Sequence, residues 1–330
     1  MKILSRISGC VLLMLGLHWS DSAQAQQMQQ VTIGLSSTSL PASTPRIAQE
    51  LGLFQRHGLK PNFVQLQNAS ASTASLISGA VDFVTSQSTD VVVSERQTQK
   101  LMSVASVYRG FSAMVIVSKS VTGKLIVSSG ASPKDKFRAL DGLVIASPSA
   151  TSIYTYALKA SADSVGARVR FTYMSQPAMV DALSKGAIQG YIASAPFYAQ
   201  SVMNGTGEIW INGPKGEFPA ASSPANTMTL NVRRDFATAN HDVTQRVSEV
   251  FVDFGRAIIE QPAAVKAAIA KIYPELDDKT LELLYATESI GWSARPLTAD
   301  DMAHELAFAR ASGMDVPRGD RVVAERLLFR

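Results

Sequence analysis

Short strands alternate with amphipathic helices from residue 31 onward, and this alternation limits the fold more than any other feature of the chain. The first unit begins with the apolar, β-branched run Val31–Leu35, and a helix follows in which Ile47, Leu51 and Phe54 recur at helical spacing. The chain then returns to a strand at 61–66. Strand, helix and strand in this order form the unit of a parallel sheet covered by helices. The sequence therefore predicts an α/β fold.

Two such series follow each other along the chain. The first ends with strands near 101–107 and 113–117, and a stretch from 119 to 138, rich in Lys, Ser and Gly, interrupts the pattern. A second series starts with a strand at 143–146 and ends with a strand near 208–211. This arrangement predicts two lobes of the same class.

The remainder of the chain continues with one more strand-like run, at 227–232, and with amphipathic helices that we expect to pack on the first lobe. We predict that each lobe is a mostly parallel sheet flanked by helices, and that two crossings near residues 118 and 224 join the lobes. In this division lobe 1 consists of residues 26–118 and 225–330, and lobe 2 consists of residues 119–224.

A short motif occurs once in each predicted lobe. The segments 76–81 (LISGAV) and 183–188 (LSKGAI) both indicate a helix end, a glycine and the start of a buried strand. Glycine is expected at the left-handed position that ends a helix. Two similar lobes explain the repeat, and chance or shared βα packing are the alternatives.

The first 25 residues have the layout of a cleavable secretory signal. Lys2 and Arg6 precede an apolar run at 11–17, and a small-x-small site that ends at Ala25 follows. The apolar run is shorter than the roughly 20 residues that span a bilayer. We therefore expect cleavage after about Ala25 and export to the periplasm. The only cysteine, Cys10, precedes the apolar run instead of following it, which disfavours a lipoprotein attachment site.

The charge of the chain is low and unclustered. The formal net charge is +4 at pH 7, and the predicted signal accounts for one unit of it through Lys2, Arg6 and Asp21. No run of Lys or Arg interleaved with aromatic residues marks a nucleic-acid surface. We therefore expect no nucleic-acid partner, and we expect the mature protein to be a soluble monomer that binds a small molecule.

Small hydroxyl and amide residues fill four loops that follow predicted strands and precede predicted helices. In open α/β sheets, ligands bind beyond the carboxyl ends of the strands, often at helix N-termini. Helix capping uses the same residue types, but four loops in the same topological position favour a shared polar cleft. The expected ligand-binding residues are Ser37, Thr38, Asn68, Ser70, Ser86, Gln87, Ser149 and Thr151, with Ser194 and Arg109 assisting. A surface salt bridge is the alternative role for Arg109.

The sequence contains no catalytic constellation that we can assemble. It lacks a Gly-x-Ser-x-Gly elbow, a His-Glu-x-x-His pattern and a glycine-rich phosphate loop. Asp300, Asp301, His304 and Glu305 are close in sequence, but a solvated helix face is favoured over a metal site. We therefore expect no enzyme activity, no cofactor and no metal. A secreted hydrolase is the runner-up hypothesis.

Several segments resemble the type 2 periplasmic solute-binding proteins of ABC importers. The segment 47–59 (IAQELGLFQRHGL) resembles their first helix, and its ELGLF and GL parts resemble the branch that serves nitrate, aliphatic sulfonates, taurine and thiamine-pyrimidine precursors. The segments 76–83 (LISGAVDF), 140–142 (LDG) and 182–188 (ALSKGAI) follow in matching order. The resemblance extends over about residues 31–200.

The resemblance implies two lobes that close on a small polar or anionic solute of the sulfonate, carboxylate or pyrimidine type. It also implies delivery of this solute to an ABC permease in the inner membrane, without catalysis. The loops after Leu35, Leu66, Thr85 and Ala146 are expected to line the cleft between the lobes.

One position departs from the pattern of these relatives. Many of them carry an acidic residue before the proline that matches Pro196, and this chain has Ala195 there. A cationic anchor at that position, and the substrates of the relatives, therefore do not carry over to this chain. Sensor domains and biosynthetic enzymes also occur in this superfamily and are the alternatives to a solute receptor.

Overall fold

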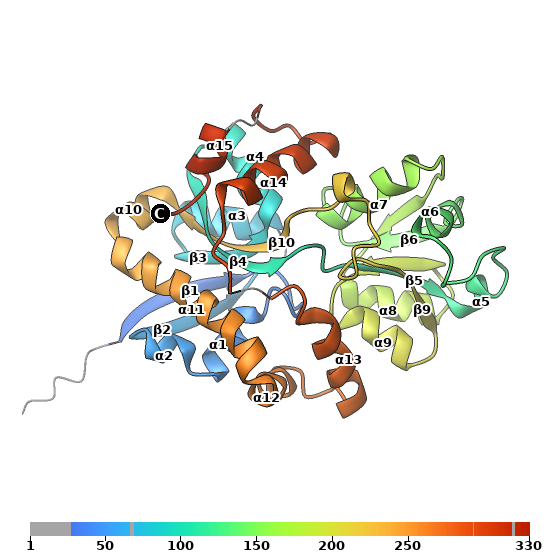
Figure 1. Cartoon of the computed structure of the whole chain (residues 1–330), viewed down its shortest axis with the longest axis horizontal. Helices are drawn as coiled ribbons and strands as arrows, with labels where there is room; N and C mark the ends of the chain where they lie inside the picture. Colours follow the sequence, from blue (N-terminus) through green and yellow to red (C-terminus); the bar gives the residue numbers. More distant parts are fainter. Residues whose placement is uncertain (1–27, 67–68, 293, 319–320) are drawn as a thin grey trace, which may run out of the picture.

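The computed structural model describes residues 28–66, 69–292, 294–318 and 321–330, and the predicted signal peptide lies outside this part of the chain. The described residues form two five-stranded sheets. Figure 1 shows the sheets side by side, with helices packed around each and two chain segments crossing between them in the middle.

The first sheet has the strand order β2-β1-β3-β10-β4. Its strands span Gln29–Leu35 (β1), Leu59–Gln65 (β2), Phe83–Gln87 (β3), Leu101–Arg109 (β4) and Asn226–Arg233 (β10). β1 runs parallel to β2 and β3, whereas β10 runs antiparallel to β3 and β4. Ile33 pairs with Phe83 in register, and both side chains are fully buried. The apolar composition of these strands follows from helices that cover both faces of the sheet.

The second sheet has the strand order β7-β6-β8-β5-β9. Its strands span Met114–Ser118 (β5), Val144–Ser147 (β6), Arg170–Tyr173 (β7), Gly190–Ala193 (β8) and Gly207–Asn212 (β9). β6 runs parallel to β7 and β8, and β5 runs antiparallel to β8 and β9. Each sheet therefore has a single antiparallel strand, which confirms the prediction of two mostly parallel sheets.

The antiparallel strand of each sheet is the first strand after a crossing between the lobes. β4 ends at Arg109 in the first sheet and β5 begins at Met114 in the second, so the first crossing lies between them. The second crossing occupies 213–225, and Gly110 N donates a hydrogen bond to the carbonyl of Ala225 (2.7 Å), which ties the two crossings together. The predicted boundary near residue 118 is therefore displaced by one strand, because the change in composition marks a surface segment after β5. The other lobe boundaries stay a prediction.

The helices divide between the two sheets. Those around the first sheet are Thr44–Glu50 (α1), Leu53–Arg56 (α2), Ala69–Ser78 (α3), Ser88–Gln97 (α4), Arg234–Ala239 (α10), His241–Glu260 (α11), Pro262–Ile272 (α12), Asp278–Glu288 (α13), Ala299–Ala311 (α14) and Arg321–Arg326 (α15). Those around the second sheet are Lys119–Thr122 (α5), Pro133–Arg138 (α6), Ile153–Asp163 (α7), Gln176–Ser184 (α8) and Phe197–Met203 (α9), and a 3₁₀ turn spans Ala220–Ser222 in the second crossing.

The C-terminal helices pack on the first lobe, as the sequence predicts. α11 contacts β4, and α14 contacts α4. The apolar face of α11, which includes Val247, Phe251 and Phe254, is buried. α13 also contacts α9 of the second lobe, where the two helices lie next to each other in Figure 1. Among the described residues, no helix combines the length and the apolar character that a membrane span requires.

The first predicted helix is interrupted in the structure. The spacing of Ile47, Leu51 and Phe54 predicts one continuous helix, but the chain forms two short helices, α1 and α2. Gly52 separates them with a left-handed φ of 70°. The glycines of the repeated motif, Gly79 and Gly186, have φ values of 79° and 69° after α3 and α8, which confirms their predicted role at helix ends.

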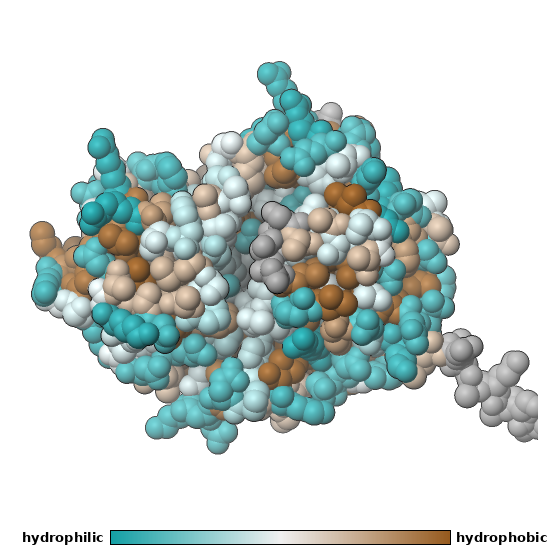
Figure 2. All heavy atoms as spheres, turned by 180° about the vertical axis from the view of Figure 1, so that it is seen from behind, coloured by the Kyte–Doolittle hydropathy of each residue, from teal (hydrophilic) through white to brown (hydrophobic). Residues whose placement is uncertain are grey.

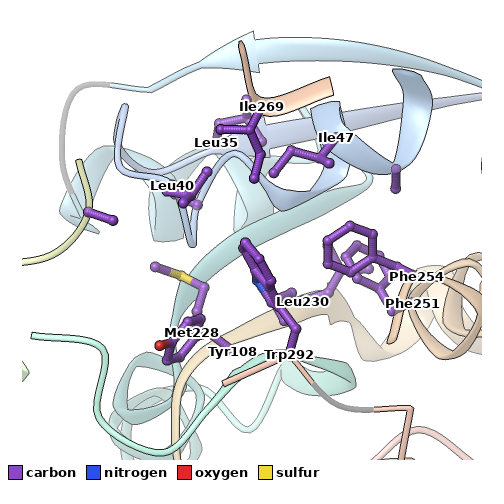
Figure 3. Close-up of a cluster of buried hydrophobic side chains, with 14 of the residues drawn as sticks. Leu35, Leu40, Ile47, Tyr108, Met228, Leu230, Phe251, Phe254, Ile269 and Trp292 are labelled. Atoms are coloured by element: carbon purple, nitrogen blue, oxygen red, sulfur yellow. The ribbon is translucent and has the colours of Figure 1, made fainter. Parts of the chain in front are cut away.

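A buried apolar cluster extends across both lobes. It joins Leu40 and Met228 of the first lobe with Tyr198 of the second lobe. Figure 3 shows Trp292 standing between Met228 and Phe254 at the centre of this cluster. Because burial of apolar surface stabilises a contact by about 25 cal/mol per Å², the contact between the lobes is favourable in this arrangement.

Candidate functional site

Loops at the carboxyl ends of strands from both sheets meet between the lobes. Gln87, the last residue of β3, donates from Nε2 to Ser152 Oγ (3.4 Å) and accepts at Oε1 from the backbone N–H of Ile153 (3.2 Å). Leu40, in the loop after β1, donates from its backbone N–H to the carbonyl of Ala195, in the loop after β8 (2.8 Å). We call these five residues the interlobe seam. Figure 2 shows a furrow between the two halves of the molecule, bordered by residues of intermediate hydropathy.

The seam is formed at the starts of helices. Gln87 is the N-cap residue of α4, and Ser152 is the N-cap residue of α7, where its Oγ accepts from Tyr154 N (3.3 Å). Parallel strands end at the same edge of a sheet, and the following helices begin there. One helix N-terminus from each lobe therefore faces the seam, and its free N–H groups favour polar or anionic groups.

The predicted residues of the loop after β1 make local contacts. Ser37 Oγ shares a hydrogen bond with Ser39 Oγ (2.9 Å) and accepts from Ser39 N (3.3 Å). Thr38 is exposed, and its carbonyl accepts from Tyr273 Oη (3.0 Å). These bonds hold Ser37 and Thr38 within the first lobe and leave the Thr38 side chain accessible.

The two predicted residues at the end of β3 point in different directions. Ser86 is buried, and its Oγ accepts from Asn231 Nδ2 of the neighbouring strand β10 (2.9 Å). Gln87 is half-buried and reaches the second lobe. Successive side chains of a strand point to opposite faces, so Gln87 reaches the seam while Ser86 faces the neighbouring strand β10.

The predicted residues of the second lobe also differ in accessibility. Ser149 and Thr151 are exposed, and their side-chain oxygens lie 3.4 Å apart. Ser194 is fully buried, and both its backbone N (2.8 Å) and its Oγ (3.1 Å) donate to Gln176 Oε1. Gln176, the first residue of α8, therefore fixes the loop after β8.

Three further predictions have separate outcomes. Asn68 lies outside the described residues. Ser70 lies in α3, and the structure describes its backbone only. Arg109 Nη1 pairs with Asp301 Oδ1 (2.8 Å), while Arg109 Nε and Nη2 are buried and make no hydrogen bond. This ion pair matches the salt-bridge alternative for Arg109, and a ligand contact of Arg109 stays a prediction.

The predicted solvated face on α14 is confirmed for Asp300 and His304, which are exposed, but not for Asp301 and Glu305. Asp301 and Glu305 are buried, because α14 packs on α4 and on the second crossing. Glu305 accepts from the backbone N–H of Asn226 (2.6 Å), and burial raises the pKa of Glu305 to about 8. Within the part of the chain that the structure describes, no group of three or more His, Cys, Asp or Glu residues could hold a metal ion.

Sequence reasoning missed a buried group of side chains from both lobes. It consists of Tyr108 on β4, Tyr154 on α7, Tyr198 on α9, Glu288 at the end of α13, and Trp292, and we call it the aromatic cluster. Tyr198 Oη donates to Glu288 Oε1 (2.7 Å), which links the second lobe to the first. The rings of Tyr108 and Trp292 meet edge to face, with centroids 6.4 Å apart.

A wider search of the sequence would have found part of this cluster. Tyr154 and Tyr198 are the second residues of α7 and α9, directly after loops in which we considered only hydroxyl and amide groups. Glu288 and Trp292 carry no local signal, because α13 is placed beside the second lobe only by tertiary packing.

Burial controls the electrostatics of the aromatic cluster. Burial raises the pKa of Glu288 to about 7, although the nearby hydroxyls of Tyr198 and Tyr108 favour its ionised form. The pKa values of Tyr108 and Tyr198 lie well above their usual range, because of burial and then because of the Glu288 carboxyl. Glu288 is therefore ionised only near or above neutral pH in this arrangement.

One protein family matches most of the chain. The model of the NMT1-like family matches residues 24–273. A comparison with curated protein sequences finds no significant match.

Solved structures with the same architecture extend over nearly the whole chain. A protein of Bordetella bronchiseptica RB50 is 18% identical, with a TM-score of 0.71 and coverage of 92% of this chain and 95% of that chain. The alkanesulfonate-binding protein SsuA from Xanthomonas axonopodis pv. citri, bound to MOPS, is 17% identical, with a TM-score of 0.67 and coverage of 91% and 98%. The periplasmic nitrate-binding protein NrtA from Synechocystis PCC 6803 is 10% identical, with a TM-score of 0.65 and coverage of 92% and 86%. These likenesses confirm the predicted two-lobed fold of type 2 periplasmic binding proteins.

Proposed function

Because the chain belongs to the NMT1-like family, we propose that it is the solute-binding component of an ABC importer. It captures a small polar or anionic organic solute, of the sulfonate, carboxylate or pyrimidine type, between its lobes. It then presents this solute to a permease in the inner membrane. The periplasm is its proposed location, with the signal removed after about Ala25.

The interlobe seam is the observation that carries this proposal. Gln87 and Leu40 of the first lobe make hydrogen bonds to Ile153 and Ala195 of the second lobe. Each such bond contributes only about 1 kcal/mol net, so a few of them hold the lobes together reversibly. A solute that bonds to both lobes adds to these contacts and favours the closed arrangement.

The chemistry of the loops supports a polar guest. The segments 36–43, 66–72, 87–89, 148–152 and 194–196 contain no charged residue. Their hydroxyl and amide groups both donate and accept hydrogen bonds. We propose that ligand contacts come from Ser37, Thr38, Asn68, Ser70, Ser86, Gln87, Ser149, Thr151 and Ser194, with Arg109 assisting; Gln87 has the strongest support, because its side chain reaches the other lobe.

Relatives of known structure agree with this class of ligand. The similar structures include an alkanesulfonate-binding protein and a nitrate-binding protein. Both names describe small polar anions. These two proteins are 17% and 10% identical to this chain. The ligand of this chain is therefore identified by a binding screen.

The test is a thermal-shift and calorimetric screen of the mature protein. The probes are ethanesulfonate, 2-aminoethanesulfonate, nitrate, propionate, pyrimidine and 4-aminopyrimidine. Saturable binding of at least one probe without loss of the probe is the expected result. Conversion of a bound probe into a product would favour the secreted hydrolase, and the absence of saturable binding across the set would contradict the proposal.

A further inference from the structure

A single carboxyl group lies buried between the lobes among aromatic side chains. Glu288 is fully buried, and its Oε1 accepts a hydrogen bond from Tyr198 Oη. Its other oxygen, Oε2, is buried and makes no hydrogen bond. A buried acceptor without a partner is rare in folded proteins because it has lost its hydration without compensation. This oxygen therefore calls for a partner that donates a hydrogen bond.

Two neighbours of Glu288 have the same property. Tyr108 Oη and Trp292 Nε1 are also buried without a hydrogen bond. The rings of Tyr108 and Trp292 contact each other, and the Glu288 carboxyl contributes to the raised pKa of Tyr108. The Tyr108 hydroxyl is near enough to the Glu288 carboxyl to favour its ionised form, but neither Tyr108 Oη nor Glu288 Oε2 makes a hydrogen bond in this arrangement. Together with Trp292 Nε1, three buried polar atoms without a hydrogen bond therefore belong to this cluster.

The position of the aromatic cluster is the position at which α/β sheets bind ligands. Tyr154 and Tyr198 lie in the first turns of the helices that follow β6 and β8, and Tyr108 precedes the last residue of β4. Tyr154 Oη shares a hydrogen bond with Ser112 Oγ of the first crossing (3.1 Å). Ligands of such sheets bind beyond the carboxyl ends of the strands. The cluster therefore adjoins the interlobe seam, and separation of the lobes would part Tyr198 from Glu288.

Glu288 differs from the other charged groups near the seam in its aromatic surroundings, since Asp90 on α4 interacts with Ser86 and with the backbone of Gln87. The loops at the strand ends carry no charged residue, and Arg109 is paired with Asp301. A carboxylate favours an N–H donor or a cation, and the faces of Tyr and Trp also attract a cation. A solute with an amino or ammonium group satisfies both preferences at once.

We infer that Glu288 determines the specificity of the interlobe site by accepting a hydrogen bond from an amino or ammonium nitrogen of the solute. This inference rests on the proposed function, because it names the class of solute that the same site takes. The apolar or flat part of the solute packs against the rings of Tyr108, Tyr154, Tyr198 and Trp292.

The test compares solutes that differ only in the nitrogen. Three matched pairs serve as probes: 2-aminoethanesulfonate against ethanesulfonate, 4-aminopyrimidine against pyrimidine, and β-alanine against propionate. Calorimetry at pH 8 measures each dissociation constant for the mature protein and for Glu288→Gln, which keeps the size of the side chain but removes its charge. Tyr198→Phe, which keeps the carboxyl group, and Glu260→Gln, on the exposed end of α11, are the controls.

In at least one pair, the solute with the amino group is expected to bind the parent protein roughly tenfold more tightly than its partner without it. This difference corresponds to one charge-assisted hydrogen bond. This preference persists in Tyr198→Phe and in Glu260→Gln and falls below about threefold in Glu288→Gln. Thermal unfolding without ligand shows whether each variant is folded. If Glu288→Gln does not fold, Glu288→Asp, which withdraws the carboxyl group by one methylene, takes its place with the same expectation.

Three other results contradict the inference, and they differ in what they leave standing. The role of Glu288 is overturned if solutes with and without the amino group bind with equal affinity. It is also overturned if the preference survives in the Glu288 variant. Both results leave the proposed solute receptor intact. Failure of every member of every pair to bind removes the proposed function together with the inference.

Discussion

The side chain of Gln87 accepts a hydrogen bond from the backbone N–H of Ile153 (3.2 Å), although the two residues are 66 positions apart and belong to different lobes. Gln87 ends β3 in the first sheet, and Ile153 begins α7 around the second. This bond can form only when the lobes are together. The contact therefore joins the end of β3 in the first lobe to the start of α7 in the second lobe and stabilises the closed arrangement.

Gln87→Ala should weaken ligand binding roughly three- to tenfold, because it removes hydrogen bonds that each contribute about 0.5–1 kcal/mol to the closed arrangement. Its melting temperature without ligand should change little, since Gln87 is only half-buried. Calorimetry with the tightest ligand of the screen measures the effect. Gln97→Ala, at the exposed far end of the same helix, is the matched control, and an equal loss in both variants would argue against a specific role of Gln87.

Gly291→Ala should destabilise the first lobe by about 1–3 kcal/mol through overpacking. A Cβ atom at Gly291 would lie 2.1 Å from Cζ of Tyr108, whose ring is buried and cannot withdraw. Urea unfolding measures the change. Gly123→Ala is the control, because its Cβ would lie 3.5 Å from the nearest atom, the Lys119 carbonyl oxygen. Equal stability of Gly291→Ala and the parent protein would show that the aromatic cluster is loosely packed.

Stability should decline from mildly acidic to alkaline pH, in part because of Glu305. Burial raises its pKa to about 8 from an ordinary value of 4.5. The folded protein therefore holds a proton that the unfolded chain has lost, so this contribution is complete below about pH 4.5 and is lost as the pH rises through 8. Melting temperatures between pH 5 and 9 should fall less steeply in Glu305→Gln than in the parent protein.

The matching control for this pH series is Glu260→Gln, because Glu260 is exposed. Its melting temperatures should follow those of the parent protein at every pH. A residual slope in Glu305→Gln is expected from Asp90 and Glu288, since burial raises the pKa of each to about 7. A slope that is identical in Glu305→Gln and in the parent protein would mean that Glu305 is not buried in solution.

The radius of gyration should shrink when ligand is added, because the two crossings allow the lobes to move relative to each other and a bound solute favours the closed arrangement. Small-angle X-ray scattering with and without a saturating concentration of ligand measures this change. An unchanged radius of gyration would indicate that the lobes stay closed in the absence of ligand.

Most of the fold was predictable from the sequence because its strands and helices differ in apolar period. The strand 31–35 and the apolar face of α11 follow directly from these patterns. The first crossing was misplaced, because β5 is as apolar as the strands before it and the composition changes only afterwards. The break at Gly52 was missed, because the apolar spacing continues through the left-handed turn.

The candidate site was predictable only in outline. Topology places the loops after β3 and β6 together, and Gln87 was found in this way. Ser86, its neighbour, bonds within the sheet because successive side chains alternate in direction. Glu288 could not be found, because its contact with Tyr198, 90 positions away, depends on how α13 packs against α9.

The most direct test of the central claim is a crystal structure of the mature protein with the tightest ligand of the screen. Our account predicts that electron density for this ligand lies between the lobes, in contact with residues on both sides of the seam that Leu40 and Ala195 define. Density bound to one lobe alone, or density on the outer surface with the seam unchanged, would contradict it.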